Sequence, residues 1–250
     1  MGEIEILKSG ERVDDLQCRG YHIIQDPKGF CFGMDAVLLA DFASGKADGK
    51  VIDLGTGTGV IPMLMHGRGK GAHFTGLEYQ EAYADMADRS VTYNKLSNDI
   101  DIVHGDIKNV RELFPAGSFD AVTSNPPYIK GDHGLANPSA PKNIARHEVA
   151  VTLSEVVDAA AYLLAPGGTF AMVHKPFRLA EIIRELSAKK LEPKRMCLVQ
   201  PGIKKEPNMV LIEATKGGGV QLTCEPTLIV YDEAGNYTDD LLTRYGPLHH

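Results

Sequence analysis

The chain has 250 residues, a formal net charge of −7 at pH 7, and 43% apolar residues. This length suffices for one large α/β domain with a substantial buried core, and no segment reaches the ~20 apolar residues needed to cross a membrane. The acidic balance argues against a surface coated throughout with positive charge for nucleic acid.

The cysteines and the N-terminal residues indicate in which cellular compartment the protein is located. Cys18, Cys31, Cys197 and Cys224 are far apart and form no C-x-x-C pair. We therefore expect free thiols in a reducing compartment, with neither a disulfide nor a metal site. The stretch Met1–Glu5 is acidic and lacks the basic region and apolar run of a signal peptide. Together these features predict a cytoplasmic protein with no membrane segment.

Strand and helix patterns alternate along the chain, which predicts an α/β fold with a mainly parallel sheet covered on both faces. Residues 130–143 are rich in Gly, Asp, Asn and Pro and predict a loop, either a lid over substrate or a surface insertion. We expect helices over 36–42, from 60 onward, 81–93, 153–164 and 179–190, and strands over 51–54, 72–77, 101–104, 119–124, 169–173, 196–199 and 209–214.

A glycine-rich turn follows the first of these strands. Gly55, Gly57 and Gly59 have the spacing G-x-G-x-G, with Asp53 two residues ahead of the first glycine. This differs from the G-x-G-x-x-G that wraps a pyrophosphate at a helix N-terminus. A carboxylate at this point suits a ligand with an ammonium group and repels phosphate. A purely structural turn is the alternative interpretation of a lone glycine loop.

Acidic residues end the next two strands as well. Glu78 ends the strand over 72–77, at the distance of about 20 residues where a carboxylate typically binds ribose hydroxyls. Asp106 follows the strand over 101–104. With Asp53, three successive strands end in acids, and this pattern indicates a nucleoside-binding edge of the sheet.

The tetrapeptide Asn125-Pro126-Pro127-Tyr128 ends a fourth strand. The Asn125 side-chain oxygen and the Pro126 carbonyl can each accept an N–H hydrogen bond from a planar amine, which favours a tetrahedral nitrogen with its lone pair directed at an electrophile. Tyr128 can stack on the planar group, and consecutive prolines stiffen the turn. The alternative is an ordinary strand-ending turn, which Asn-Pro favours in any protein.

These motifs together resemble the class I S-adenosylmethionine-dependent methyltransferases, in particular the amino-directed branch with an Asn-Pro-Pro-Tyr motif. The resemblance implies a Rossmann-like seven-stranded sheet with an antiparallel last strand. It also implies S-adenosylmethionine as cofactor and no metal. Its expected cofactor-binding residues are Asp53, Gly55, Thr56, Gly57 and Gly59 around the methionine part, Glu78 at the ribose, Asp106 at the adenine amine, and Asn125. Its expected catalytic residues are Asn125, Pro126, Pro127 and Tyr128.

Residues 25–40, 145–148 and 228–238 are similar to the bacterial tRNA (adenine-N6) methyltransferases that act on valine tRNA beside the anticodon. The resemblance implies tRNA as substrate. Within the first run, Phe32 and Asp35 are candidate substrate-binding residues. Cys31 and Met34 depart from the basic and small polar residues expected there, which puts one RNA or cofactor contact in doubt.

A basic stretch follows the predicted active site. Residues 174–216 contain ten Lys or Arg against five Asp or Glu. Because the run His174–Arg178 mixes cations with an aromatic ring beside a strand end, we take Lys175, Phe177 and Arg178 as further candidate RNA contacts. The alternative is a solvated helix face. His147 has two interpretations, a general base or a polar contact at a helix start.

We expect residues 1–48 to contribute to the site, 49–216 to form the cofactor-binding core, and 217–250 to be an extension packed on it. Glutamine methylation of a release factor and guanine-N2 methylation of ribosomal RNA use the same tetrapeptide and stay open. An inactive methyltransferase-fold module that binds RNA or protein is the alternative from another class. Glycine spacing and Asp53 disfavour a nicotinamide dehydrogenase. The oligomeric state is left open.

Overall fold

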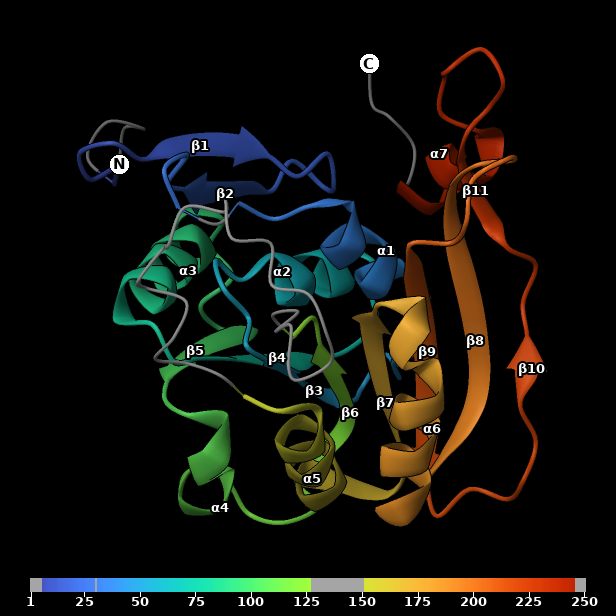
Figure 1. The fold of residues 1–250 in the computed structure, drawn as a ribbon. Helices are drawn as coiled ribbons and strands as arrows, with labels where there is room; N and C mark the ends of the chain where they lie inside the picture. The colour runs from blue at the N-terminus through green and yellow to red at the C-terminus, as the bar shows by residue number, and fades with distance from the viewer. Residues whose placement is uncertain (1–5, 30, 127–150, 246–250) are drawn as a thin grey trace, which may run out of the picture.

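A computed structural model describes residues 6–29, 31–126 and 151–245, and a nine-stranded sheet with helices on both faces forms its centre (Figure 1). The strands lie side by side in the order β10-β8-β9-β7-β6-β3-β4-β5, and β11 also pairs with β8. Their bounds are β3 (Lys50–Leu54), β4 (His73–Glu78), β5 (Ile100–His104), β6 (Phe119–Ser124), β7 (Leu164–His174), β8 (Leu191–Gly202), β9 (Met209–Lys216), β10 (Thr223–Cys224) and β11 (Leu228–Tyr231).

The strand directions confirm the expected sheet. β5, β4, β3, β6 and β7 pair in parallel, whereas β9 runs antiparallel to both of its neighbours, β7 and β8. The seven expected strands are thus present, with the last of them antiparallel. The short strands β10 and β11 extend this sheet by pairing in parallel with β8.

Helices pack on both faces of the sheet because the side chains of successive strand residues point to opposite faces. Val51 contributes to one buried apolar cluster and Ile52 to a second, on opposite faces of β3. The first face carries α1 (Met34–Phe42), α2 (Val60–Gly67) and α3 (Glu81–Tyr93), and the second carries α4 (Val110–Leu113), α5 (Leu153–Leu163) and α6 (Leu179–Ala188) (Figure 1).

Local sequence explains where α5 begins. α5 starts with a capping box, in which the Thr152 hydroxyl accepts from the Glu155 amide and the Glu155 carboxylate accepts from the Thr152 amide. The helix expected over 153–164 nevertheless ends at Leu163. Pro166, Gly167 and Gly168, which lie between the expected helix and the expected strand over 169–173, fall within β7 itself. The pairing of β7 with β6 shifts register there, between Phe119 and Ala121.

Both ends of the described chain contain elements that the sequence patterns missed. A hairpin of β1 (Arg12–Asp15) and β2 (His22–Gln25) lies over α3, at the upper left of Figure 1. The Ile24 amide donates to the Ser90 hydroxyl of that helix at 2.9 Å. At the other end, α7 (Asp239–Tyr245) lies beside β11 and α1.

The topology places the candidate functional residues at one edge of the sheet. Because β3, β4, β5, β6 and β7 are parallel, their carboxyl ends meet there, and β8 and β11 end at the same edge. The loop predicted over 130–143 and the run 145–148 lie outside the described residues.

Candidate active site

The glycine turn between β3 and α2 requires glycine at three positions. Gly55, Gly57 and Gly59 have φ angles of 76°, 57° and 86°, in the left-handed region that other residues avoid. A Cβ added at Gly57 would meet no atom within 4 Å, so this part of the turn faces open space. The turn is held to the next strand because the amides of Gly55 and Thr56 both donate to the carbonyl of Leu77. It is therefore a stiff cradle open to a ligand.

Asp53 lies at the base of this cradle and is only 1% exposed. The Thr123 hydroxyl donates to its Oδ1 at 2.6 Å. Burial raises the pKa of Asp53 to about 6, and the Thr123 hydrogen bond partly opposes that rise. Among the described residues, Asp53 Oδ2 and Thr56 Oγ1 are buried without a hydrogen-bond partner. Since buried polar atoms are normally paired, these two fit a ligand with a donor group such as an ammonium.

Glu78, at the end of β4, is also buried. Its Oε2 accepts from the Gly57 amide and its Oε1 from the Gln80 amide, both at 2.9 Å. Burial raises the pKa of Glu78, while these backbone hydrogen bonds favour the ionised form. Each oxygen keeps a further lone pair, so the carboxylate is held in a geometry that suits a diol.

Asp106 follows β5 and caps the short helical turn Ile107–Asn109. Its Oδ1 accepts from the Lys108 amide at 2.9 Å, which fixes the carboxylate at the carboxyl edge of the sheet. Asp53, Glu78 and Asp106 therefore end three adjacent strands, as the sequence predicts.

Asn125 follows β6, next to the cradle. Its Nδ2 donates to Oδ2 of Asp35 at 3.0 Å, and Oδ1 of Asp35 accepts from the Ala36 amide in the first turn of α1. Pro126 is buried, whereas Pro127 and Tyr128 lie outside the described residues. Phe32, half-buried, donates its amide to the Gln25 side chain. The structure thus brings the candidates Asp35 and Asn125 into direct contact.

The residues that follow β7 lie in two different environments. Phe177 is 84% exposed, and Lys175 Nζ lies 3.4 Å from the carbonyl oxygen of Asn208. Arg178 instead forms a bidentate ion pair with Glu181, at 2.7 and 2.5 Å. The charge of Arg178, a candidate RNA contact, is therefore neutralised locally by Glu181. Burial and the nearby Arg178 lower the pKa of His174 to about 4, so this imidazole is neutral at pH 7.

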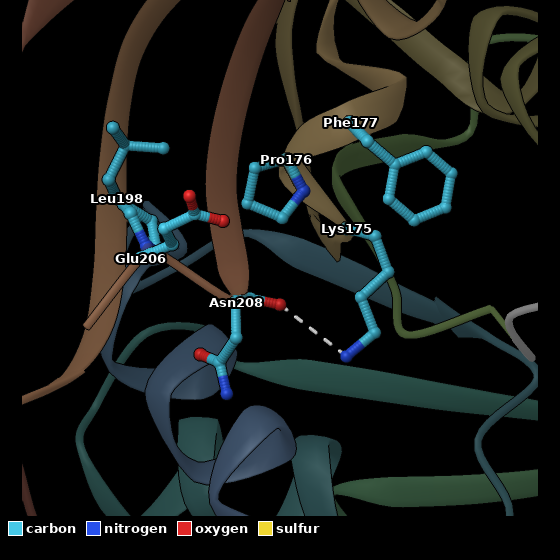
Figure 2. Close-up of a pocket in the computed structure, with 7 residues that line it drawn as sticks. Lys175, Pro176, Phe177, Leu198, Glu206 and Asn208 are labelled. Atoms are coloured by element: carbon cyan, nitrogen blue, oxygen red, sulfur yellow. Dashed lines mark hydrogen bonds between the residues drawn. The ribbon is translucent and has the colours of Figure 1, made fainter.

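Sequence reasoning missed two features near this edge. Tyr245 of α7 has its pKa raised to about 12, first by burial and then by the neighbouring groups Tyr237 and Asp35. A hollow of about 470 Å³ opens beside β7 (Figure 2), lined by Lys175, Pro176, Phe177, Leu198, Glu206, Pro207 and Asn208. No local pattern predicts either, because both depend on contacts between distant parts of the chain.

The described residues contain no group of three or more His, Cys, Asp or Glu side chains arranged to hold a metal ion. Among the helices in the described part of the chain, none is long and apolar enough to cross a membrane.

Comparison with solved structures agrees with this fold. A predicted O-methyltransferase from Agrobacterium tumefaciens is 24% identical, with a TM-score of 0.66 over 84% of this chain and 96% of the other. Geranyl diphosphate C-methyltransferase from Streptomyces coelicolor, in complex with S-adenosyl-L-homocysteine, is 14% identical, with a TM-score of 0.53 over 72% of this chain and 75% of the other. These likenesses concern the fold.

The sequence itself is similar to proteins named tRNA1(Val) (adenine(37)-N6)-methyltransferase. The protein of that name from Photobacterium profundum is 26% identical over 87% of this chain and 90% of its own length. The one from Porphyromonas gingivalis is 28% identical over 87% and 88%. The family model of the methyltransferase small domain matches residues 32–190, well over half of the chain and the part that contains the acidic strand ends and Asn125. The chain therefore belongs to the methyltransferase small domain family.

Proposed function

We propose that this protein transfers a methyl group from S-adenosylmethionine to N6 of an adenine beside the anticodon of a tRNA. The tRNA that we propose as substrate is valine tRNA. The observation that carries the proposal is the position of Asn125, which is held by Asp35 immediately beside the acid-lined cradle. The names of the similar proteins from Photobacterium profundum and Porphyromonas gingivalis support tRNA adenine as substrate.

Three carboxylates are proposed to hold the cofactor. Oδ2 of Asp53 would pair with the ammonium group of the cofactor. Thr56 Oγ1 and the glycine turn would surround the methionine part. Glu78 would bind the two ribose hydroxyls, and Asp106 the adenine amine. When bound, S-adenosylmethionine would supply an electrophilic methyl group on a sulfonium sulfur, and the methylated amine of the substrate would lose its proton to water.

The residues after β6 would position the target amine. Asn125 Oδ1 and the Pro126 carbonyl accept its two N–H groups, which aligns the nitrogen lone pair with the methyl carbon. Pro127 would stiffen the turn, and Tyr128 would stack on the base. Asp35 would act as a positioning residue, because its bond to Nδ2 fixes the plane and direction of the Asn125 amide.

Other parts of the chain would hold the RNA. Lys175 and Phe177 lie after β7 and suit a phosphate contact and base stacking. Phe32, whose side chain packs partly buried against the apolar core, and Arg178, which is paired with Glu181, are the other proposed RNA contacts. We also infer the division into a contributing segment over 1–48, a core over 49–216 and an extension over 217–250. A tRNA substrate and free cysteines support a cytoplasmic location.

The substrate is tested directly. The protein is incubated with isotopically labelled S-adenosylmethionine and, in parallel, with unmodified bulk tRNA, ribosomal RNA or a release factor, and the product is identified by mass spectrometry. We expect N6-methyladenosine in tRNA. Label in guanine of ribosomal RNA, or in a glutamine side chain, would replace this substrate with one of its rivals, and no label anywhere would favour a non-catalytic binding module.

A further inference from the structure

Exposed aromatic rings continue along the sheet edge beyond Asn125. Phe177, after β7, is 84% exposed. Tyr231, the last residue of β11, is 40% exposed, and Tyr237 is 47% exposed. Exposed aromatic rings that gather on one edge, unlike single scattered ones, mark a contact surface. We call these three residues the aromatic edge.

Strand pairing places the aromatic edge relative to the target. Ser124 of β6 pairs with Met172 of β7, so Pro126 is level with His174, the residue that ends β7 shortly before Phe177. Tyr231 pairs with Gly202 at the end of β8. The order β11, β8, β9, β7 separates β11 from β7 by three strand spacings across the sheet, about 14 Å. Gly202, the partner of Tyr231, also lies four residues beyond Leu198, which is level with His174. The cofactor cradle lies on the other side of β6, so the aromatic edge continues from the target position away from the cofactor.

Tyr231 and Tyr237 form a pre-arranged pair. Their ring centroids are 5.2 Å apart with an interplanar angle of 23°, and a backbone bridge joins the two residues. Asp232 Oδ1 accepts from the amides of Ala234 and Asn236, which stabilises the turn between them. A platform that is already ordered costs less to bind than a mobile one.

The hollow beside Phe177 has mixed chemistry (Figure 2). Pro176, Pro207 and Leu198 supply apolar surface, while Glu206 and Asn208 supply hydrogen-bonding groups. An apolar lining with a few polar groups suits a nucleobase, which presents π-faces and a donor and acceptor edge.

Lysines accompany these groups. Lys175 lies at the hollow, and Lys204 and Lys205 lie in the connection between β8 and β9. Lys204 Nζ is 3.5 Å from Glu233, but both side chains are more than three-quarters exposed, so the pair is weak and the ammonium stays available to a phosphate.

We infer that the aromatic edge binds unpaired nucleotides of the RNA strand that carries the target adenine. One base occupies the hollow against Phe177, and another stacks on the Tyr231–Tyr237 pair. This inference rests on the proposed function and specifies the form of its substrate. A regular double helix keeps its base faces stacked internally, so it cannot make these contacts.

The test measures binding of a fluorescent anticodon stem-loop RNA in the presence of S-adenosylhomocysteine. Phe177→Ala and Tyr237→Ala should each raise the Kd by about 5-fold to 150-fold, the range found for loss of one base stack. Phe177→Tyr and Tyr237→Phe keep the rings and should stay close to wild type. Val220→Ser, a 92% exposed apolar residue after the opposite end of β9, is the matched control and should bind normally.

Three further readouts separate the outcomes: the salt dependence of binding, methylation kinetics, and competition by duplex RNA. If at most three lysines contact phosphates of a single strand, the logarithm of the association constant should fall with the logarithm of the salt concentration with a slope of about −2 or shallower. Wild-type methylation of tRNA together with unchanged Kd and KM in both alanine variants would overturn the aromatic edge and leave the proposed function standing. Equal competition by a duplex RNA would also overturn it. Absence of tRNA methylation by the wild type would instead overturn the proposed function.

Discussion

Asp35 Oδ2 accepts a hydrogen bond from Asn125 Nδ2 at 3.0 Å, across 90 positions of the sequence. The contact joins the first turn of α1 to the end of β6. An amide held by its nitrogen has its oxygen oriented on the other side, and Asp35 is itself anchored by the Ala36 amide. The direction in which Asn125 accepts hydrogen bonds is therefore decided by the N-terminal part of the chain.

Removing the Asp35 carboxylate should slow the reaction without releasing the cofactor. Asp35→Ala loses a charge-assisted hydrogen bond, so we expect kcat to fall about 10-fold to 100-fold. Asp35→Asn retains an acceptor oxygen and should recover part of that loss. Steady-state kinetics over a range of tRNA concentrations measures kcat and KM separately. A rise in KM alone, with kcat unchanged, would show that Asp35 holds RNA and does not position Asn125.

Asn125→Ala should remove most turnover, by about 10²-fold to 10³-fold, because under the proposed mechanism it deletes the acceptor that holds the reacting amine. S-adenosylhomocysteine affinity, measured by calorimetry, should change only a few-fold. A variant with ordinary turnover would contradict the role given to the tetrapeptide.

Cofactor affinity should depend on pH through Asp53, whose pKa is raised to about 6 by burial. Above pH 6 the ionised carboxylate attracts an ammonium group. Below it, protonation removes the charge, and we expect the Kd of S-adenosylhomocysteine to rise by up to about tenfold per pH unit. Calorimetry from pH 5 to 8 tests this. Asp53→Asn is the comparison, because it should bind S-adenosylhomocysteine weakly and with a Kd that does not depend on pH.

The raised pKa of Asp53 has the opposite effect on the folding stability of the ligand-free protein, to which Asp53 contributes less as the pH rises. A folded-state pKa above the unfolded value of 3.8 means that the folded protein binds the proton more tightly. The contribution of Asp53 to stability is therefore full below about pH 4 and is lost as pH rises through 6. Comparing melting curves of wild type and Asp53→Asn over this range should show the variant gaining relative stability with rising pH.

A buried ion pair should support the sheet beneath the site. Glu213 of β9 is 4% exposed, pairs with Arg195 Nε at 2.8 Å and accepts from the Ser44 amide at 2.6 Å. Glu213→Ala leaves the partly buried guanidinium short of a partner and should lower the unfolding free energy by about 3 kcal/mol. Lys204→Ala, which breaks an exposed pair, should change it by less than about 1 kcal/mol. Urea denaturation of both variants makes the comparison, and equal losses would contradict it.

Local sequence explains much of the fold. Apolar periodicity locates α3 and β6 at their observed bounds, and the three glycines occupy left-handed positions as their spacing suggests. The β1–β2 hairpin escaped prediction because its first strand, Arg12–Asp15, is mostly charged and has no buried face. Its stability comes from contacts with α3, including the hydrogen bond to Ser90, which no local pattern contains.

What the sequence by itself determined is the chemistry at the strand ends. Asp53, Glu78, Asp106 and Asn125 each follow an apolar run, and parallel strands bring their carboxyl ends to one edge whatever the details of packing. Only the tertiary structure decided which side chains meet there from elsewhere. The Asp35–Asn125 bond and the aromatic edge depend on long-range packing and strand register, which bring together residues whose separation along the chain carries no periodic signal.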